Sequence, residues 1–184
     1  MSINIAVNGA AGRMAQELIA EISQNSSAQL NAALVRPKHR LVDHAVIFPA
    51  PQDDDSTAAI IYSDSPQTAL QTCDLLIDFS LPKATLAILP IALENNTPLL
   101  IGFSLPKATL EILPIAIENK IPLLIGTTGF SEQQLTQLEA AALSIPLLLA
   151  PNTSIGVNST LVLLTQAAKL LGQHADIEII ESHH

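Results

Sequence analysis

The sequence is poor in aromatic residues and in cysteine. It has no tryptophan, and phenylalanine and tyrosine together bring the aromatic share to only 3% of 184 residues. A core with so few rings must be filled by aliphatic side chains, which suits a parallel sheet buried by helices on both faces. The one cysteine, Cys73, excludes an internal disulfide and a thiolate-rich metal site, and is typical of a reducing compartment.

Basic residues are also scarce. There are 8 Lys and Arg against 17 Asp and Glu, a formal net charge of −9. A protein that binds nucleic acid by neutralising many phosphates needs a basic face, so this balance argues against a nucleic-acid partner. The hydrophobic share of 48%, with only 14% charged residues, argues equally against intrinsic disorder.

No stretch of the sequence predicts a membrane span or a signal peptide. The longest uncharged window, residues 140–168, is interrupted by Pro146, Pro151 and Gly156, whereas a span needs about 20 predominantly apolar residues. The first residues lack the basic segment and the long apolar segment of a signal peptide. These absences predict a cytoplasmic protein with no membrane partner.

What the sequence does contain is an alternation of apolar strands and amphipathic helices. This pattern predicts an α/β fold, a Rossmann-like doubly wound parallel sheet. Ser131 and Gln134 have the spacing of a capping box and predict a helix start. The expected strands cover residues 3–7, 29–35, 60–62, 75–79, 99–101, 123–125, 147–150 and 176–181, and the expected helices include residues 13–24, 66–72 and 158–171.

A 24-residue segment occurs twice in tandem, as residues 79–102 and 103–126. Each copy predicts one helix followed by one strand. Two units are too few for a solenoid, which needs about three, so we interpret the pair as a duplicated α–β unit or as an error in the sequence. A natural duplicate adds a strand to the sheet or leaves one copy extruded, and the sequence does not decide between these arrangements. The copies differ at four positions, Ala87/Glu111, Leu93/Ile117, Asn96/Lys120 and Thr97/Ile121.

A glycine-rich turn joins the first expected strand to the first expected helix. Residues 9–15 have the spacing G-x-x-G-x-x-A. Gly9 permits a tight turn, Gly12 lets the backbone approach a ligand, and the small Ala15 lets the helix pack on the sheet. The N–H groups at the helix start then face outward, where a pyrophosphate binds. The alternative is a glycine-rich turn with a structural role only.

A cluster of basic residues follows the second expected strand. An NAD site usually carries an acid about 20 residues after the glycine turn, to bind the ribose hydroxyls. That position is Val35 here, and Arg36, Lys38 and Arg40 follow it. Such a cluster suits a 2′-phosphate, so the sequence favours NADPH over NADH. The alternative is an exposed basic loop that balances the acidic residues 53–55.

Five segments, in their order along the chain, resemble one enzyme family. They are residues 9–14, 75–80, 126–130, 150–158 and 178–184. Together they resemble the 4-hydroxy-tetrahydrodipicolinate reductases (dihydrodipicolinate reductases) of bacterial and plant lysine biosynthesis. The resemblance implies NAD(P)H-dependent hydride transfer to a small dicarboxylate substrate in the diaminopimelate route, by a homotetramer.

The resemblance also implies roles for individual residues. The glycine turn would bind the pyrophosphate, Arg36 the 2′-phosphate, residues 126–128 the nicotinamide, and residues 150–153 a second part of the cofactor. His183 matches the family's acid–base histidine, a residue type suited to proton transfer near neutral pH, and His184 matches a substrate-contacting one. The alternative for this pair is a tag remnant or a frayed end. The implied cofactor-binding residues are Gly9, Ala10, Ala11, Gly12, Arg13, Met14, Arg36, Gly126, Thr127, Thr128, Ala150, Pro151, Asn152 and Thr153.

Two parts of the chain correspond to different parts of the family pattern. Residues 1–156 correspond to the NAD(P)-binding domain, and residues 157–184 to a linking helix and the first strand of a substrate and tetramerisation domain. The family pattern continues beyond the paired histidines with segments that these 184 residues do not contain, so we expect weak or no activity from them. Two other interpretations stay open, a non-catalytic dinucleotide-binding module and a defective gene fragment.

Overall fold

The computed structural model describes residues 2–48, 59–101, 105–172, 174–178 and 180. The acidic run of residues 53–55 and the paired His183 and His184 lie outside the described residues. The chain divides into two compact units, Met1–Pro151 and Asn152–His184, which are described one at a time.

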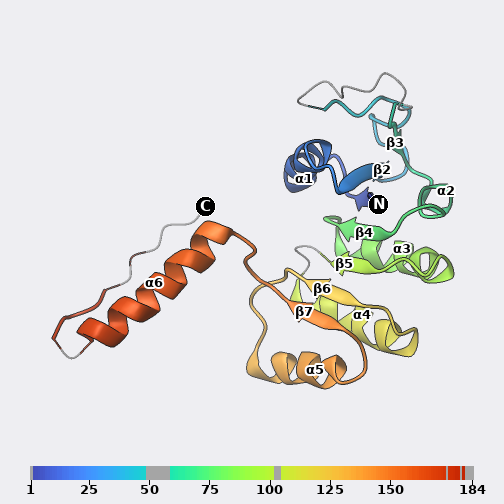
Figure 1. Ribbon diagram of the computed structural model, residues 1–184. Helices are drawn as coiled ribbons and strands as arrows, with labels where there is room; N and C mark the ends of the chain where they lie inside the picture. Colours follow the sequence, from blue (N-terminus) through green and yellow to red (C-terminus); the bar gives the residue numbers. More distant parts are fainter. Residues whose placement is uncertain (1, 49–58, 102–104, 173, 179, 181–184) are drawn as a thin grey trace. The chain divides into compact units, whose positions relative to one another are not determined.

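The first unit is a parallel sheet of seven strands in the order β3-β2-β1-β4-β5-β6-β7 (Figure 1). This is the doubly wound order 3-2-1-4-5-6 with one further strand, and it confirms the predicted fold class. The strands are β1 (Ile3–Asn8), β2 (Ala28–Leu34), β3 (Tyr62–Ser63), β4 (Leu75–Asp78), β5 (Leu99–Ile101), β6 (Leu123–Ile125) and β7 (Leu147–Leu149). The helices of this unit are α1 (Arg13–Ser23), α2 (Pro66–Ala69), α3 (Pro82–Glu94), α4 (Pro106–Glu118) and α5 (Glu132–Ala142).

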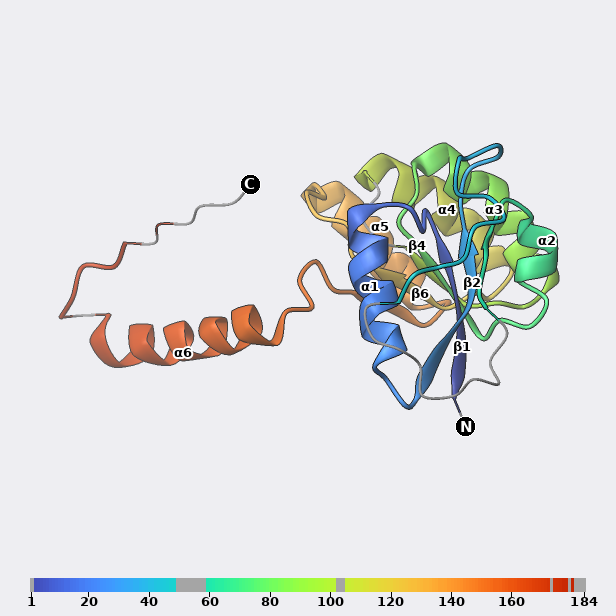
Figure 2. The same ribbon diagram turned by 90° about the horizontal axis from the view of Figure 1, so that it is seen from above.

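Helices cover the two faces of the sheet because successive strand residues point to opposite faces. Val7 of β1 packs in the cluster that contains α1, whereas Ala6 packs in the cluster that contains α3, α4 and α5. Figure 2 shows α1 on one side of the strands and α3 and α4 on the other. Among the buried core residues that the structure describes, Tyr62 is the one aromatic side chain, in line with the aliphatic composition.

The two copies of the 24-residue segment fold alike and lie side by side. Each forms a helix and a strand, α3 with β5 and α4 with β6, and the two strands pair with each other in parallel (Figures 1 and 2). The register is the same throughout, because Leu99 pairs with Leu123 and Leu123 pairs with Leu147. Both copies therefore sit in the sheet, and neither is extruded. Each buries an aliphatic helix face, with Ile88 and Leu89 in α3 and the equivalent pair in α4.

Helix α5 begins with the predicted capping box. The Ser131 hydroxyl accepts the backbone N–H of Gln134 at 3.3 Å, and the Gln134 side chain accepts the backbone N–H of Ser131 at 2.9 Å. Both donors would otherwise be unpaired at a helix start.

The second unit contains one long helix, α6 (Ile155–Leu171), capped by the Ser154 hydroxyl. The strand expected over residues 176–181 is wrong for the described residues 176–178 and 180, which form no strand. A strand needs a neighbour to satisfy its backbone groups, and the described part of this unit offers none. Among all described helices, none is long and apolar enough to cross a membrane.

Candidate functional site

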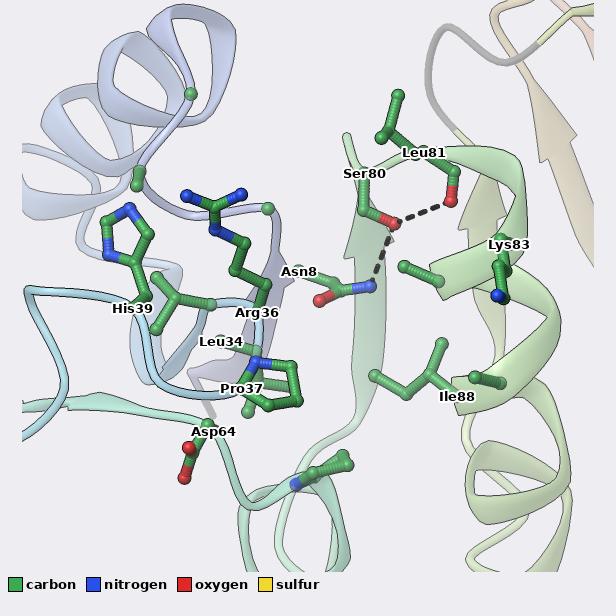
Figure 3. Close-up of a pocket in the computed structure, with 17 residues that line it drawn as sticks. Asn8, Leu34, Arg36, Pro37, His39, Asp64, Ser80, Leu81, Lys83 and Ile88 are labelled. Atoms are coloured by element: carbon green, nitrogen blue, oxygen red, sulfur yellow. Dashed lines mark hydrogen bonds between the residues drawn. The ribbon is translucent and has the colours of Figure 1, made fainter.

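A cavity of about 710 Å³ opens at the carboxyl ends of β1, β2 and β4 (Figure 3). The chain leaves β1 towards β2 on one side and later enters β4 on the other, so the cavity lies where the winding of the sheet reverses. Ligands of open α/β sheets bind at this point. The lining residues are Asn8, Gly9, Ala11, Gly12, Leu34, Val35, Arg36, Pro37, His39, Asp64, Pro66, Ser80, Leu81, Lys83, Ala84, Ala87 and Ile88.

The glycine turn forms one edge of the cavity. Gly9 has a φ of +75°, and a Cβ there would lie 2.9 Å from the carbonyl carbon and oxygen of Phe79. Position 9 therefore requires glycine, because of its positive φ and because the backbone at the end of β4 leaves no space for a Cβ. The Gly12 N–H donates to the Gly9 carbonyl at 2.8 Å, which closes the turn.

Gly12 faces the ligand side of the turn. It is the N-cap of α1, and no described side chain caps this helix. A Cβ on Gly12 would lie 3.2 Å from the Gly9 carbonyl oxygen, a close contact with the backbone of the same turn, and Gly12 itself lines the cavity. The first N–H groups of α1 are thus left for an anionic group, which the helix dipole also favours.

Other residues of this segment take different places. Ala11 lines the cavity, whereas Ala10 is fully buried and its N–H donates to the Leu34 carbonyl at 2.9 Å. Arg13 and Met14 are not among the lining residues, and 55% of the Met14 surface is exposed.

The basic cluster after β2 places one cation in the cavity. Arg36 lines it, next to Val35, which stands where an NAD site carries an acid. Lys38 and Arg40 are not among the lining residues, and the backbone of Lys38 turns through a φ of 59°. His39 lies between them in the sequence and lines the cavity instead, and the sequence carried no signal that selected it.

A buried hydrogen-bond network connects the ends of β1 and β4. Asp78 is 1% exposed, and its Oδ1 accepts from the Asn8 side-chain amide at 3.2 Å and from the Ser80 N–H at 2.8 Å. The Asn8 amide also donates to the Ser80 hydroxyl at 3.1 Å (Figure 3). Asn8 and Ser80 line the cavity, so this carboxylate holds two polar cavity residues in place.

The wall opposite Arg36 is formed by the start of α3. Lys83, Ala84, Ala87 and Ile88 line it after Ser80 and Leu81. Sequence reasoning did not select these residues, because the same Ser-Leu-Pro-Lys-Ala-Thr occurs at both helix starts, before α3 and before α4.

The other cofactor segments implied by the resemblance are not among the residues that line this cavity. Residues 126–128 follow β6, and β5 stands between β6 and β4. Thr127 is 2% exposed, and its hydroxyl is 3.1 Å from the Thr109 hydroxyl of α4. Ala150 and Pro151 follow β7 at the end of the first unit, whereas Asn152 and Thr153 belong to the second. None of these residues is among those lining the cavity.

Cys73 is outside the site and is a structural thiol. It donates to the Ala69 carbonyl at 3.0 Å, and the Asn31 side-chain amide donates to its sulfur at 3.2 Å. Burial raises the pKa of the thiol, the Asn31 hydrogen bond opposes this, and the nearby Asp74 adds to it. The described residues hold no group of acidic, histidine and cysteine side chains that could bind a metal ion.

Comparisons with known proteins identify relatives over the whole chain. The family model "Dihydrodipicolinate reductase, N-terminus" matches residues 3–102 and 99–153. The 4-hydroxy-tetrahydrodipicolinate reductase of Alkalilimnicola ehrlichii is 39% identical over 189 residues, covering 100% of this chain and 59% of the relative. That of Citrifermentans bemidjiense is 34% identical over 183 residues, covering 99% and 58%. The chain therefore spans somewhat over half the length of these relatives.

A solved structure was also matched, with lower similarity. It is a dipicolinate-bound dihydrodipicolinate reductase from Paenisporosarcina sp. TG-14, which is 19% identical with a TM-score of 0.49. The match covers 68% of this chain and 47% of that one.

Proposed function

The chain belongs to the dihydrodipicolinate reductase family, and from this membership we propose that it is the nucleotide-binding part of an NADPH-dependent reductase of lysine biosynthesis. The reaction would reduce a dihydrodipicolinate-type precursor to tetrahydrodipicolinate in the diaminopimelate route. One observation carries the proposal, namely that Gly12 and Arg36 line the same cavity at the reversal point of the sheet.

The cavity fits the adenosine end of the cofactor. Gly12 lines the cavity at the uncapped start of α1, where a pyrophosphate would bind. Ala10, Arg13 and Met14 complete this turn, and we assign them to its backbone shape and not to side-chain contacts. The apolar side chains of Pro37 and the exposed Leu81 offer a surface for the adenine ring.

Arg36, which follows β2, favours NADPH, the cofactor with a phosphate on its adenosine ribose. Arg36 lines the cavity and is preceded by Val35, whose side chain cannot accept hydrogen bonds from ribose hydroxyls. A guanidinium binds a phosphate through parallel charge-assisted hydrogen bonds. We therefore expect NADPH to bind more tightly than NADH.

Further residues complete the proposed reaction. NADPH, when bound, supplies the hydride. We assign Gly126, Thr127 and Thr128 to the nicotinamide end, and residues 150–153 to a second contact with the cofactor. His183 would donate the proton, and His184 would contact the dicarboxylate substrate.

Turnover, assembly and location are part of the same proposal. We expect the 184 residues alone to bind NADPH but to reduce substrate weakly or not at all. A dicarboxylate needs converging cations, and Arg36, which lines the described cavity, is assigned here to the cofactor. We also propose that the protein assembles as the family homotetramer and that it is cytoplasmic. Sedimentation measures the assembly, and cell fractionation measures the location.

The central test is a fluorescence titration of NADPH into the purified chain. We expect saturable binding by the wild type and at least about tenfold weaker binding by Gly12→Ala, because its methyl group occupies the pyrophosphate side of the turn. The φ of −77° at Gly12 is open to alanine, and the Gly9 carbonyl oxygen, 3.2 Å from the new Cβ, must yield by a few tenths of an ångström. Circular dichroism checks that the fold is preserved. Absence of NADPH binding by the wild type would refute the proposal.

A further inference from the structure

Helices α3 and α4 have nearly the same sequence but different surroundings. Lys83 of α3 lines the cavity, whereas the equivalent Lys107 of α4 is not among the lining residues. The next position shows the same contrast, because Ala84 lines the cavity and is exposed, whereas Ala108 is buried and only 6% exposed. The place of each helix beside the sheet, and not its residues, therefore makes α3 a cavity wall.

One of the four differences between the copies falls on this wall. Ala87 lines the cavity one helical turn after Lys83, and the second copy has Glu111 at the equivalent position. Side chains four residues apart are neighbours on one helix face. A glutamate at position 87 would thus place a carboxylate beside Lys83.

The charges that line the cavity lie on two sides. Figure 3 shows Arg36, His39 and Asp64 on one side and Lys83 on the other, on α3. Asp64 is the one acidic residue among those that line the cavity, and its Oδ2 already accepts the Lys38 backbone N–H at 3.2 Å. The α3 wall carries a positive charge and no negative one.

We propose that Lys83 and Ala87 select the phosphorylated cofactor. Lys83 is the second cation for the phosphate on the adenosine ribose, on the opposite side of the cavity from Arg36, and Ala87 keeps this wall free of negative charge. The inference rests on the proposed function and extends it to residues of the first copy alone. Lys83 is a binding residue here, with no part in hydride or proton transfer.

The chain contains its own control for Lys83. We expect Lys83→Gln to weaken NADPH binding roughly two- to fivefold, the range for an exposed charged contact, and to leave NADH binding unchanged. Lys107→Gln removes the same charge from the same local sequence and should leave both affinities unchanged. Isothermal titration with NADPH and NADH measures all four values. Equal losses for the two cofactors, or equal losses for the two variants, would overturn the assignment.

Position 87 tests the charge of the wall directly. We expect Ala87→Glu to weaken NADPH binding more than about tenfold, because the carboxylate repels the phosphate and pairs with Lys83. The glutamine of Ala87→Gln is nearly the same size as glutamate but carries no charge. This variant should therefore bind NADPH clearly more tightly than Ala87→Glu. Equal binding by these two variants would contradict the role of charge.

The outcomes separate this inference from the function on which it rests. If the wild type binds neither cofactor, the proposed function fails. If the wild type binds NADPH and Lys83→Gln binds it equally well, the inference alone fails.

Discussion

The side-chain amide of Asn8 donates a 3.2 Å hydrogen bond to Oδ1 of Asp78, across the paired ends of β1 and β4. These two residues are register partners and the last residues of their strands. The same oxygen accepts the Ser80 N–H, so one buried carboxylate joins two segments that are 70 residues apart in the sequence. The carboxyl ends of β1 and β4, where the cavity opens, are thereby held together.

Replacing Asp78 should affect stability and binding together. We expect Asp78→Ala to lower the free energy of unfolding by about 1–3 kcal/mol, because the buried Asn8 amide and the partly buried Ser80 N–H lose the acceptor that they share, and to weaken NADPH binding. Urea unfolding and NADPH titration measure the two effects. Asp74→Ala is a matched control, since Asp74 is exposed and bonds to the Asn4 N–H at the opposite end of the same strand pair. A loss no larger than that of the control would contradict the prediction.

The stability of the fold should increase when Thr97 of the first copy is replaced by the residue at the equivalent position of the second copy. The Thr97 side chain is 1% exposed, and its hydroxyl has no partner within the described structure. The second copy has Ile121 at this position, 5% exposed, with an equivalent backbone bond to the preceding helix. We expect Thr97→Ile to raise the free energy of unfolding by about 1–2 kcal/mol. The reciprocal Ile121→Thr should lower it by a similar amount. Thermal denaturation measures both, and a destabilised Thr97→Ile would indicate overpacking instead.

Deleting residues 103–126 should leave a folded protein with six strands. The deletion removes α4 and β6 and joins β5 to the segment that begins at Thr127. Because β5 and β7 both pair with Leu123 of β6, β7 can pair with β5 in the same register. Thr127 and Thr128 would then follow the strand next to β4, about 4.8 Å closer to the cavity. We expect a cooperative unfolding transition and tighter NADPH binding than in the full chain. Loss of cooperativity would show that the second copy is needed for folding.

The reactivity of Cys73 should depend strongly on pH. Burial raises the pKa of this thiol, so the folded chain holds less thiolate than an unfolded one at the same pH. Alkylation by iodoacetamide at pH 8 should therefore be slower in the folded chain than in urea. The shift also stabilises the fold below the ordinary thiol pKa, and this contribution is lost as the pH rises through the folded value. Cys73→Ser should remove that part of the pH dependence, measured by urea unfolding from pH 7 to 10. Equal alkylation rates in the two states would contradict the prediction.

Local patterns were sufficient for most elements of the fold. The strands Leu99–Ile101 and Leu123–Ile125 were predicted with the bounds that the structure has, and the capping box of Ser131 formed as expected. Each depends on residues within a few positions of one another. The strand expected over residues 176–181 failed in its described part because a strand depends on a partner, which its own alternation of residues does not supply.

The residues of the candidate site also fall into those that local sequence patterns predicted and those that they did not. Gly9, Gly12 and Arg36 carried their signal in the sequence, as glycine spacing and as a basic residue at a strand end. Lys83 and Ala87 carried none, because a near-identical segment follows 24 residues later.

The sequence by itself determined the order of strands and helices, the glycine turn and the aliphatic character of the core, since these follow from local conformation and from side-chain hydrophobicity. Only the tertiary structure decided that both copies join the sheet and that α3, not α4, faces the cavity. The two helices have nearly the same residues and differ in their neighbours. Helix α3 follows β4, beside the point where the winding reverses, whereas α4 follows β5, one strand farther away. Position in the sheet is a property of long-range strand pairing, and no local pattern contains it.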